Sequence, residues 1–289
     1  MPELPEVETV KRGLQKLILN RKIISVKSDN PKSFPNSELD VKNFLVNSDV
    51  TDVRRRAKVL LIDLSTDYTL VIHLKMTGQL VFVNNTERFA AGHPNDSLVG
   101  KLPDKSTRVI FEFNDESHLY FNDQRKFGWV RLMPTAEVPN IDFMKRVGPE
   151  PLEASFTVNE FTERFSRRSK TTIKAAILDQ SVIAGVGNIY ADESLWGAKI
   201  HPGRQVGTIT KPEFKKLYEE VRAVMNLSIE KGGSTNRNYV NAEGKKGSYM
   251  DFARVFRREG LECPRCGTEI IKIRVAGRGT HICPECQRL

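Results

Sequence analysis

The first residues of the chain, Pro2-Glu3-Leu4-Pro5-Glu6, could carry out amine chemistry. Removal of Met1, which a small second residue normally permits, would leave Pro2 as a secondary amine, and an α-amino group has a pKa near ~8. Such an amine attacks electrophilic carbon to form a Schiff base, and the adjacent Glu3 could act as general acid or base on the same carbon. The alternative is that Met-Pro is simply a common start and that the glutamates only favour a helix N-terminus.

Four cysteines, all in two Cys-x-x-Cys pairs, form the strongest spacing signal in the chain. Sixteen residues separate Cys263 and Cys266 from Cys283 and Cys286, which is the layout of a four-thiolate zinc ribbon. Because every position is a thiolate, the metal would be structural. Two disulfides or a redox pair are the alternatives, but the chain shows no export signal and no thioredoxin-like context, which favours zinc.

Several short basic or glycine-rich segments could contact phosphate. Arg278 lies between two glycines at the expected tip of a predicted hairpin, where the backbone can approach a phosphate closely. The turn 185–188 ends in an asparagine cap before a predicted helix and would present unpaired N–H groups to an anion. Cations also occur at 54–58, around Lys170, and at 122–128 beside an aromatic residue. Each segment, taken alone, is equally consistent with a solvated turn.

The composition favours a polyanionic partner. The 289 residues include 45 basic and 36 acidic side chains, giving a net charge of +9 and a pI near 9.4. Such a bias points to nucleic acid first and to an acidic membrane second. No apolar run approaches the ~20 residues of a membrane span, and the N-terminus lacks the layout of a signal peptide. We therefore expect a cytoplasmic protein that does not bind membranes.

Apolar periodicity predicts a helix followed by a series of strands. Leu4, Val7, Val10, Leu14 and Leu17 recur every three or four residues, as on one face of an amphipathic helix. Runs of β-branched and aromatic residues predict strands at 23–26, 59–64, 70–74, 109–113, 119–121 and 129–132. The polar stretch 84–107, rich in Asn, Gly and Pro, is expected to be a long exposed loop. Together these patterns predict an antiparallel sandwich capped by the first helix.

The composition changes after Leu132, where prolines and glycines mark a linker. Helical patterns follow at 157–166, 171–179, 188–197 and 211–231. We therefore expect an α+β fold with four parts: an N-terminal sandwich (1–133), a linker (134–155), a helical domain (156–259) and a zinc ribbon (260–289).

Together these segments resemble the formamidopyrimidine-DNA glycosylase family, which also contains endonuclease VIII. The similarity runs from 1–8 to 283–287 and includes the strings at 73–78, 125–128, 185–193 and 275–280. It implies a helix-capped antiparallel β-sandwich, a helix–two-turn–helix domain and a C-terminal zinc ribbon with one structural Zn²⁺. It also implies a monomeric, bifunctional DNA glycosylase and abasic-site lyase of base excision repair, acting on damaged double-stranded DNA in a bacterial cytoplasm, where DNA would hold it at the nucleoid.

The same resemblance implies a role for each matching residue. Pro2 would be the nucleophile, Glu3 the acid that helps to open the deoxyribose, and Glu6 a supporting carboxylate. Phosphates would be held by Lys58 beside the catalytic centre and by Arg278 with Asn188. Lys170, from the basic cluster noted above, is expected to be a further phosphate contact. The gap left by the extruded base would be filled by Met76, Arg125 and Phe127. The loop that closes over that base would include Ser234, Asn236, Arg237, Asn238 and Tyr239.

Two details concern the substrate and the strength of DNA binding. Leu4 and the string at 275–280 are similar to the purine-directed branch, which implies removal of 8-oxoguanine and formamidopyrimidine followed by β,δ-elimination. Ser106 stands where the family usually has a DNA-contacting histidine, so the resemblance implies that Ser106 contacts DNA in its place. Phe256 stands where the family has a tyrosine. The alternatives are an endonuclease VIII-like enzyme for oxidised pyrimidines and a zinc-ribbon DNA-binding protein without catalysis.

Overall fold

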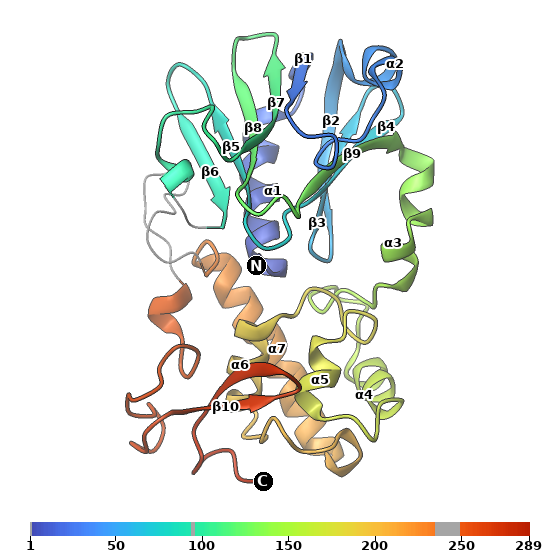
Figure 1. The fold of residues 1–289 in the computed structure, drawn as a ribbon. Coiled ribbons are helices and arrows are strands. Elements are labelled where there is room, and N and C mark those ends of the chain that lie inside the picture. Colours follow the sequence, from blue (N-terminus) through green and yellow to red (C-terminus); the bar gives the residue numbers. More distant parts are fainter. Residues whose placement is uncertain (1, 94–95, 235–248) are drawn as a thin grey trace. The chain divides into compact units, whose positions relative to one another are not determined.

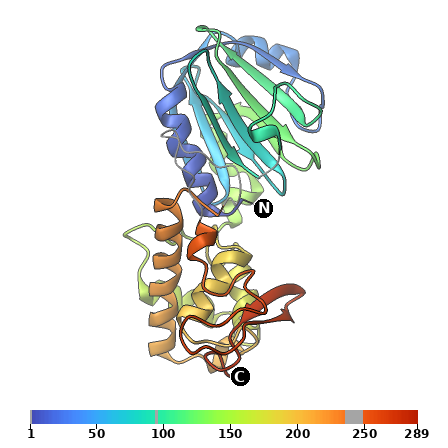
Figure 2. The same cartoon turned by 90° about the vertical axis from the view of Figure 1, so that its left-hand side faces the viewer.

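The computed structural model describes residues 2–93, 96–234 and 249–289. The chain divides into two compact units. Unit 1 comprises Met1–Lys145 and Lys231–Ser248, and unit 2 comprises Arg146–Glu230 and Tyr249–Leu289. Figures 1 and 2 show the elements of each unit from two directions. In the described part of the chain, no helix is both long enough and apolar enough to cross a membrane.

Unit 1 begins with helix α1 (Leu4–Ile18), and this confirms the predicted amphipathic helix. All five residues of the predicted apolar stripe are buried. The strands of this unit are β1 (Lys22–Ser28), β2 (Ser48–Arg56), β3 (Val59–Leu64), β4 (Tyr68–His73), β5 (Gly78–Val83), β6 (Arg88–Gly92), β7 (Thr107–Phe113), β8 (His118–Asp123) and β9 (Trp129–Pro134). Helix α1 packs against β2, β3, β5 and β6, and Figure 1 shows it running along the strands. Between β1 and β2 lie α2 (Glu38–Asp40) and η1 (Val41–Leu45).

These strands form a β-sandwich, as the sequence predicts. Their order is β6-β5-β8-β7-β1-β2-β3-β4-β9, and each neighbouring pair is antiparallel. The pairing between β1 and β2 is short, since only Lys22 and Ile23 pair with Asp49 and Ser48. The strands on either side of this short pairing can therefore separate into two layers, and the apolar residues of both layers meet in one core.

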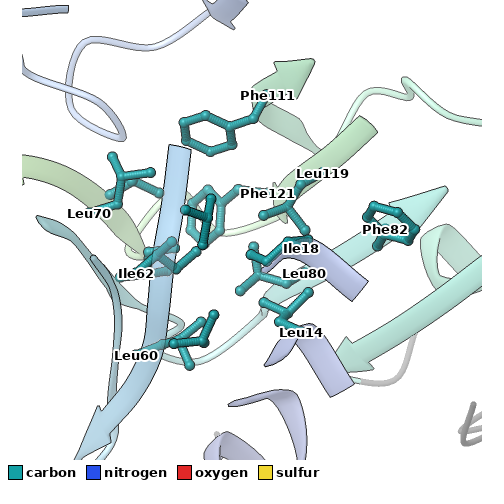
Figure 3. Packing of buried hydrophobic residues seen from close by; sticks show 14 of the residues in the cluster. Leu14, Ile18, Leu60, Ile62, Leu70, Leu80, Phe82, Phe111, Leu119 and Phe121 are labelled. Carbon is teal, nitrogen blue, oxygen red and sulfur yellow. The ribbon is translucent and has the colours of Figure 1, made fainter. Parts of the chain in front are cut away.

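That core also contains the buried face of α1 (Figure 3). Its members include Leu14 and Ile18 from α1, Leu60, Ile62 and Leu70 from one layer, and Leu80, Phe82, Phe111, Leu119 and Phe121 from the other. Successive strand residues point to opposite faces, so Val59 and Leu61 lie on the outer face of β3, where they pack with Val138. Val138 belongs to η3 (Thr135–Asn140), which is followed by α3 (Asp142–Arg146). The first half of the predicted linker thus covers one outer face of the sandwich.

The expectation of a long exposed loop at 84–107 is wrong. Strand β6 pairs along β5 within this stretch, and Phe89 enters the main core. Leu98, in η2 (Asp96–Leu98), is also buried. The sequence of β6, Arg-Phe-Ala-Ala-Gly, has no β-branched residue, so strand propensity gives it little weight. Strands β2 and β5 also lie outside the predicted runs.

Unit 2 contains the helices predicted after the linker and the hairpin of the terminal module. Its elements are α4 (Val158–Ser166), α5 (Ile173–Leu178), α6 (Asn188–Gly197), η4 (Val206–Thr208), α7 (Lys211–Glu230), η5 (Tyr249–Phe252), β10 (Ile271–Val275) and β11 (Arg278–Ile282). Thr157 and Thr172 cap α4 and α5, since their side chains accept hydrogen bonds from Glu160 N and Ala175 N. Helix α6 packs against α5, α7 and β11, so it joins the helical part to the hairpin.

Candidate active site and DNA-contact residues

The N-terminal residues of unit 1 are held in a defined position by the first turn of α1. Pro2 is buried, and Glu3 is only 4% exposed. The backbone N–H of Glu3 donates to Glu6 Oε2 over 2.8 Å, and Val7 N donates to Glu3 O over 3.1 Å. Together with the Glu3 side chain, which accepts from the backbone of Glu6, this arrangement is a capping box. The backbone that follows the predicted nucleophile is therefore fixed.

Glu6 also binds a segment far away in the sequence. Its second oxygen, Oε1, accepts a hydrogen bond of 2.8 Å from the backbone N–H of Ser234. Gly233, with a φ of +93° that favours glycine, brings this backbone against the Glu6 side chain. One carboxylate, 6% exposed, thus connects the N-terminus with the start of the predicted base-recognition loop. The other predicted loop residues, Asn236, Arg237, Asn238 and Tyr239, lie outside the described residues.

Lys58 lies at the turn of the β2–β3 hairpin and is 6% exposed. Its neighbour Ala57 has a left-handed φ of 52°, which allows the tight connection between Arg56 and Val59. His73 is buried at the end of β4, and its Nδ1 accepts from Lys75 N over 3.0 Å. Burial, reinforced by the positive charges of Lys75 and Lys58, lowers the pKa of His73 to about 3. The imidazole beside these cations is therefore neutral at physiological pH.

Two other cations of the segment 54–58 form ion pairs with carboxylates of the same unit. Arg54 pairs with Asp63, and Arg55 Nε donates to Glu8 Oε2 over 2.9 Å. Burial alone would raise the pKa of Glu8, but hydrogen bonds from Arg55 and Arg12 outweigh it and hold the pKa below its usual value. Arg55 thus joins α1 to the sheet, and Arg54 joins β2 to β3. Lys58 is the residue of this segment that we retain as a DNA-contact candidate.

The predicted gap-filling residues project from two neighbouring turns of unit 1. Met76 lies between β4 and β5 and is 39% exposed, and Phe127 lies between β8 and β9 and is 54% exposed. The guanidinium of Arg125 stacks over the Phe127 ring at 4.8 Å from its centroid. An exposed aromatic and methionine beside a cation suit insertion into a base stack. Sequence reasoning missed Asp123, a buried carboxylate that bonds to both turns.

Ser106 differs from the expectation that it contacts DNA. It is 2% exposed, and its hydroxyl donates to Asp104 Oδ1 over 2.7 Å and lies 2.9 Å from the Ser97 hydroxyl. The neighbouring Arg108 is also buried and donates to the backbone oxygens of Asp123 and Lys105. Ser106 and Arg108 thus hold the end of β8 through buried hydrogen bonds to the backbone of Asp123. We therefore leave Ser106 out of the proposed DNA-binding set.

In unit 2, Asn188 and Arg278 are brought together by the hairpin. Gly187, not Asn188, is the N-cap of α6, which corrects the predicted asparagine cap. The Asn188 side chain instead donates to Gly279 O over 3.0 Å, next to Arg278. The hairpin tip is Ala276-Gly277, both with positive φ, and Arg278 is the first residue of β11 rather than part of the tip. Its side chain is exposed, so it is available to a ligand.

A buried ion pair supports the same hairpin. Lys174 and Asp192 are both 0% exposed and are bonded to each other, while Lys174 Nζ also donates to Thr280 Oγ1 over 2.7 Å. Asp192 Oδ2 accepts from His281 N over 2.9 Å. Helices α5 and α6 therefore hold the strand that carries Arg278 through fully buried charges. Buried charged groups with several hydrogen-bond partners fix the local geometry, because removing one charge of the pair leaves the other buried and unpaired, which is strongly destabilising.

An open pocket of about 540 Å³ lies beside this hairpin. It is lined by Asn188, Phe256, Arg257, Glu259, Lys272, Arg278, Gly279 and His281. Three of these side chains are cationic, which suits a phosphate group. Lys170, the remaining predicted phosphate contact, is exposed in the turn between α4 and α5.

The four cysteines gather at the end of unit 2, where their sulfur atoms all lie within 4.8 Å of one another. The Sγ–Sγ distances are 3.4 Å for Cys266–Cys283, 3.5 Å for Cys266–Cys286 and 4.0 Å for Cys263–Cys286. A tetrahedral site with Zn–S bonds of about 2.3 Å needs sulfur atoms about 3.8 Å apart. The cysteines are free thiols, so the predicted disulfide alternative is wrong and the donor set fits one zinc ion.

Three family models match successive parts of the chain. They are the formamidopyrimidine-DNA glycosylase N-terminal domain at 1–130, the formamidopyrimidine-DNA glycosylase H2TH domain at 147–240, and the zinc finger found in FPG and IleRS at 260–289. A formamidopyrimidine-DNA glycosylase of Pelotomaculum thermopropionicum is 42% identical over 290 residues, covering 100% of both chains.

Solved structures are similar over the same length. A Lactococcus lactis FPG mutant bound to Fapy-dG-containing DNA matches with a TM-score of 0.87 and 35% identity, covering 100% of both chains. MutM in complex with DNA that contains carbocyclic 8-oxo-G matches with a TM-score of 0.85 and 35% identity, again covering 100% of both chains.

Proposed function

Because the chain belongs to the formamidopyrimidine-DNA glycosylase family, it is a DNA glycosylase of base excision repair for oxidised purines, and we propose that Pro2 is its nucleophile. The observation that carries this proposal is that the Glu6 carboxylate accepts two backbone hydrogen bonds, one with each oxygen. That carboxylate fixes the backbone of Glu3, directly after Pro2, and the backbone of Ser234, at the start of the predicted base-recognition loop. The proposed nucleophile and the proposed base-binding segment thus share one anchor.

The reaction begins once Met1 has been removed and Pro2 carries a free secondary amine. Its lone pair attacks C1′ of the damaged nucleotide, and the bond from C1′ to the base breaks. The departing base keeps the electron pair and takes up a proton, while the proline nitrogen loses its N–H proton and regains a lone pair. Glu3 protonates the ring oxygen O4′, so that the C1′–O4′ bond opens and C1′ becomes doubly bonded to the proline nitrogen. The iminium has no N–H proton to lose, and it therefore remains a cationic electron sink.

Strand cleavage follows from the same intermediate, which accounts for the abasic-site lyase activity of the enzyme. The iminium makes the C2′ protons acidic, and loss of one of them allows elimination of the 3′ phosphate. A second elimination expels the 5′ phosphate. Hydrolysis of the remaining iminium releases the sugar fragment and returns Pro2 to its free amine. We propose a one-nucleotide gap as the product.

We assign the remaining residues to holding and distorting the DNA. Lys58, Arg278, Asn188 and Lys170 would bind phosphates, since charge-assisted bonds to phosphate are strong and directional. Extruding the damaged base costs a few kcal/mol of stacking and pairing. Met76, Arg125 and Phe127 are exposed and suited to replace part of the lost stacking.

The structural metal has no part in these steps. The ribbon cysteines bind one zinc ion, which adds folding energy to the module that carries Arg278. We further propose that the protein acts as a monomer in the cytoplasm, where a reducing environment keeps the four thiols available for zinc.

Substrate choice is tested by single-turnover excision from matched duplexes that carry 8-oxoguanine, formamidopyrimidine, thymine glycol, dihydrouracil or an abasic site. We expect the two purine lesions to be excised faster than the two pyrimidine lesions. The opposite order would favour the endonuclease VIII-like alternative. Cleavage of the abasic site alone would leave a lyase without the expected glycosylase specificity.

A further inference from the structure

Two turns lie side by side at one end of the sandwich in unit 1. Strands β4 and β9 pair as far as His73 and Trp129, while β5 and β8 pair as far as Gly78 and Asp123. The connections 74–77 and 124–128 therefore both pass from one layer to the other at the same edge. They carry the residues that we call the wedge residues, which are Met76 on the first turn and Arg125 and Phe127 on the second.

The side chain of Asp123 joins these two turns. Its Oδ1 accepts from the Thr77 hydroxyl, on the first turn, and from the backbone N–H of Arg125 over 3.2 Å. Its Oδ2 accepts from the backbone N–H of Gly128 over 2.6 Å, at the far end of the second turn. The Arg125 N–H also points to the Thr77 hydroxyl, at 3.1 Å. One carboxylate thus spans the base of both turns.

The surroundings of Asp123 make this arrangement stiff. Asp123 is 0% exposed and Thr77 is 8% exposed, so water offers little competition for these bonds. A buried carboxylate is costly unless donors surround it, which favours the one backbone arrangement that supplies them all. There is also little free space at Gly128, where an added Cβ would lie 2.8 Å from the Phe121 ring and 3.1 Å from Asp123 Oδ2.

We propose that Asp123 is a positioning residue for base extrusion, which holds the two turns as one body so that the wedge residues enter the duplex at a fixed spacing. Asp123 is buried and acts through the Thr77 hydroxyl and the backbone N–H groups of Arg125 and Gly128, so it does not touch DNA itself. Loss of its charge would let the turns move independently, and their side chains would fill the gap in the stack less well. This inference rests on the proposed function, because it concerns the step that precedes excision.

The test compares a reaction that needs the wedge residues with one that does not. The first is single-turnover excision of 8-oxoguanine from a duplex. The second is cleavage of a single-stranded oligonucleotide with a preformed abasic site, which has no base to extrude and no stack to fill. We expect Asp123→Asn and Thr77→Val to slow the duplex reaction at least about tenfold, the effect of losing one hydrogen bond to a charged group, and to change the single-strand reaction less than about twofold. Thr77→Ser keeps the hydroxyl and should restore the duplex rate.

Asp63→Asn is the matched control. Asp63 also accepts from a threonine hydroxyl, that of Thr69, but it lies at the opposite end of β3 from the strand pair Val59–His73, and so away from both turns. Both of its rates should match the wild type. An Asp123→Asn enzyme with normal duplex excision would overturn the inference, as would one in which both reactions fall together with the melting temperature. Failure of the wild-type protein to excise 8-oxoguanine would instead count against the proposed function.

Discussion

Replacement of Glu6 by glutamine should slow excision strongly while leaving the protein folded. The carboxylate accepts two backbone N–H bonds of 2.8 Å, from Glu3 and from Ser234, and it is 6% exposed. Glutamine has one acceptor oxygen, so its amide group would face one of the two donors. A hydrogen bond to a charged group contributes about 1.5–3 kcal/mol, and losing one of about 2 kcal/mol from the reactive arrangement corresponds to about a 30-fold lower rate.

The assay is single-turnover excision of 8-oxoguanine from a duplex, with the melting temperature measured in parallel. Glu8→Gln serves as the control, because Glu8 is a buried carboxylate on the same helix whose partners are Arg55 and Arg12. We expect this control to lower the melting temperature by a few degrees, as the loss of about 1 kcal/mol does, with little effect on excision. Excision by Glu6→Gln within about threefold of the wild-type rate would refute the reasoning. It would mean that losing the hydrogen bond raises the activation free energy of excision by less than about 1 kcal/mol.

Three further predictions concern the metal, the phosphate grip and the pH dependence of stability. Metal analysis should find one zinc per chain, and Cys266→Ser should abolish binding of lesion-containing DNA while the sandwich stays folded; disulfides in the native protein would contradict this. Arg278→Ala should weaken binding or excision by about 2 kcal/mol and lower the salt slope by about 0.9, whereas Arg274→Ala on the same hairpin should do neither. His73 has a pKa of about 3 in the folded protein against 6.5 when unfolded, so the unfolded chain binds the extra proton between these values. The free energy of unfolding should therefore fall as pH drops from 6.5 towards 3, by up to about 1.4 kcal/mol per pH unit, and urea titrations should show a shallower fall for His73→Asn.

Local patterns in the sequence predict much of this fold. The apolar stripe of α1 is buried as expected, because a repeat of three to four residues places the apolar side chains on one face of the helix, and that face packs against the core. The cysteine spacing likewise predicts four sulfur atoms in one place. Strand β6 is missed, because Arg-Phe-Ala-Ala-Gly has no β-branched residue and becomes a strand only through pairing with β5.

The site is less predictable, because its geometry depends on contacts between distant segments. Glu6 and Ser234 are separated by 228 positions, and their bond uses a backbone N–H that no side-chain pattern reports. Asn188 resembles a helix cap, but its side chain binds the hairpin near Arg278 instead. Asp123 lies within a segment that the sequence marks as basic and aromatic, and its burial beneath both turns becomes visible only in the folded unit.

The most direct test of the account is the identity of the residue that becomes covalently bound to DNA. Wild-type protein is mixed with an 8-oxoguanine duplex in the presence of borohydride, and the trapped complex is digested and analysed by mass spectrometry. A Schiff-base intermediate on the N-terminal amine predicts a reduced sugar adduct on the peptide that begins with Pro2, and no adduct for Pro2→Gly carrying an N-terminal extension. An adduct on a lysine such as Lys58, or strand nicking unaffected by blocking the N-terminus, would contradict the central claim.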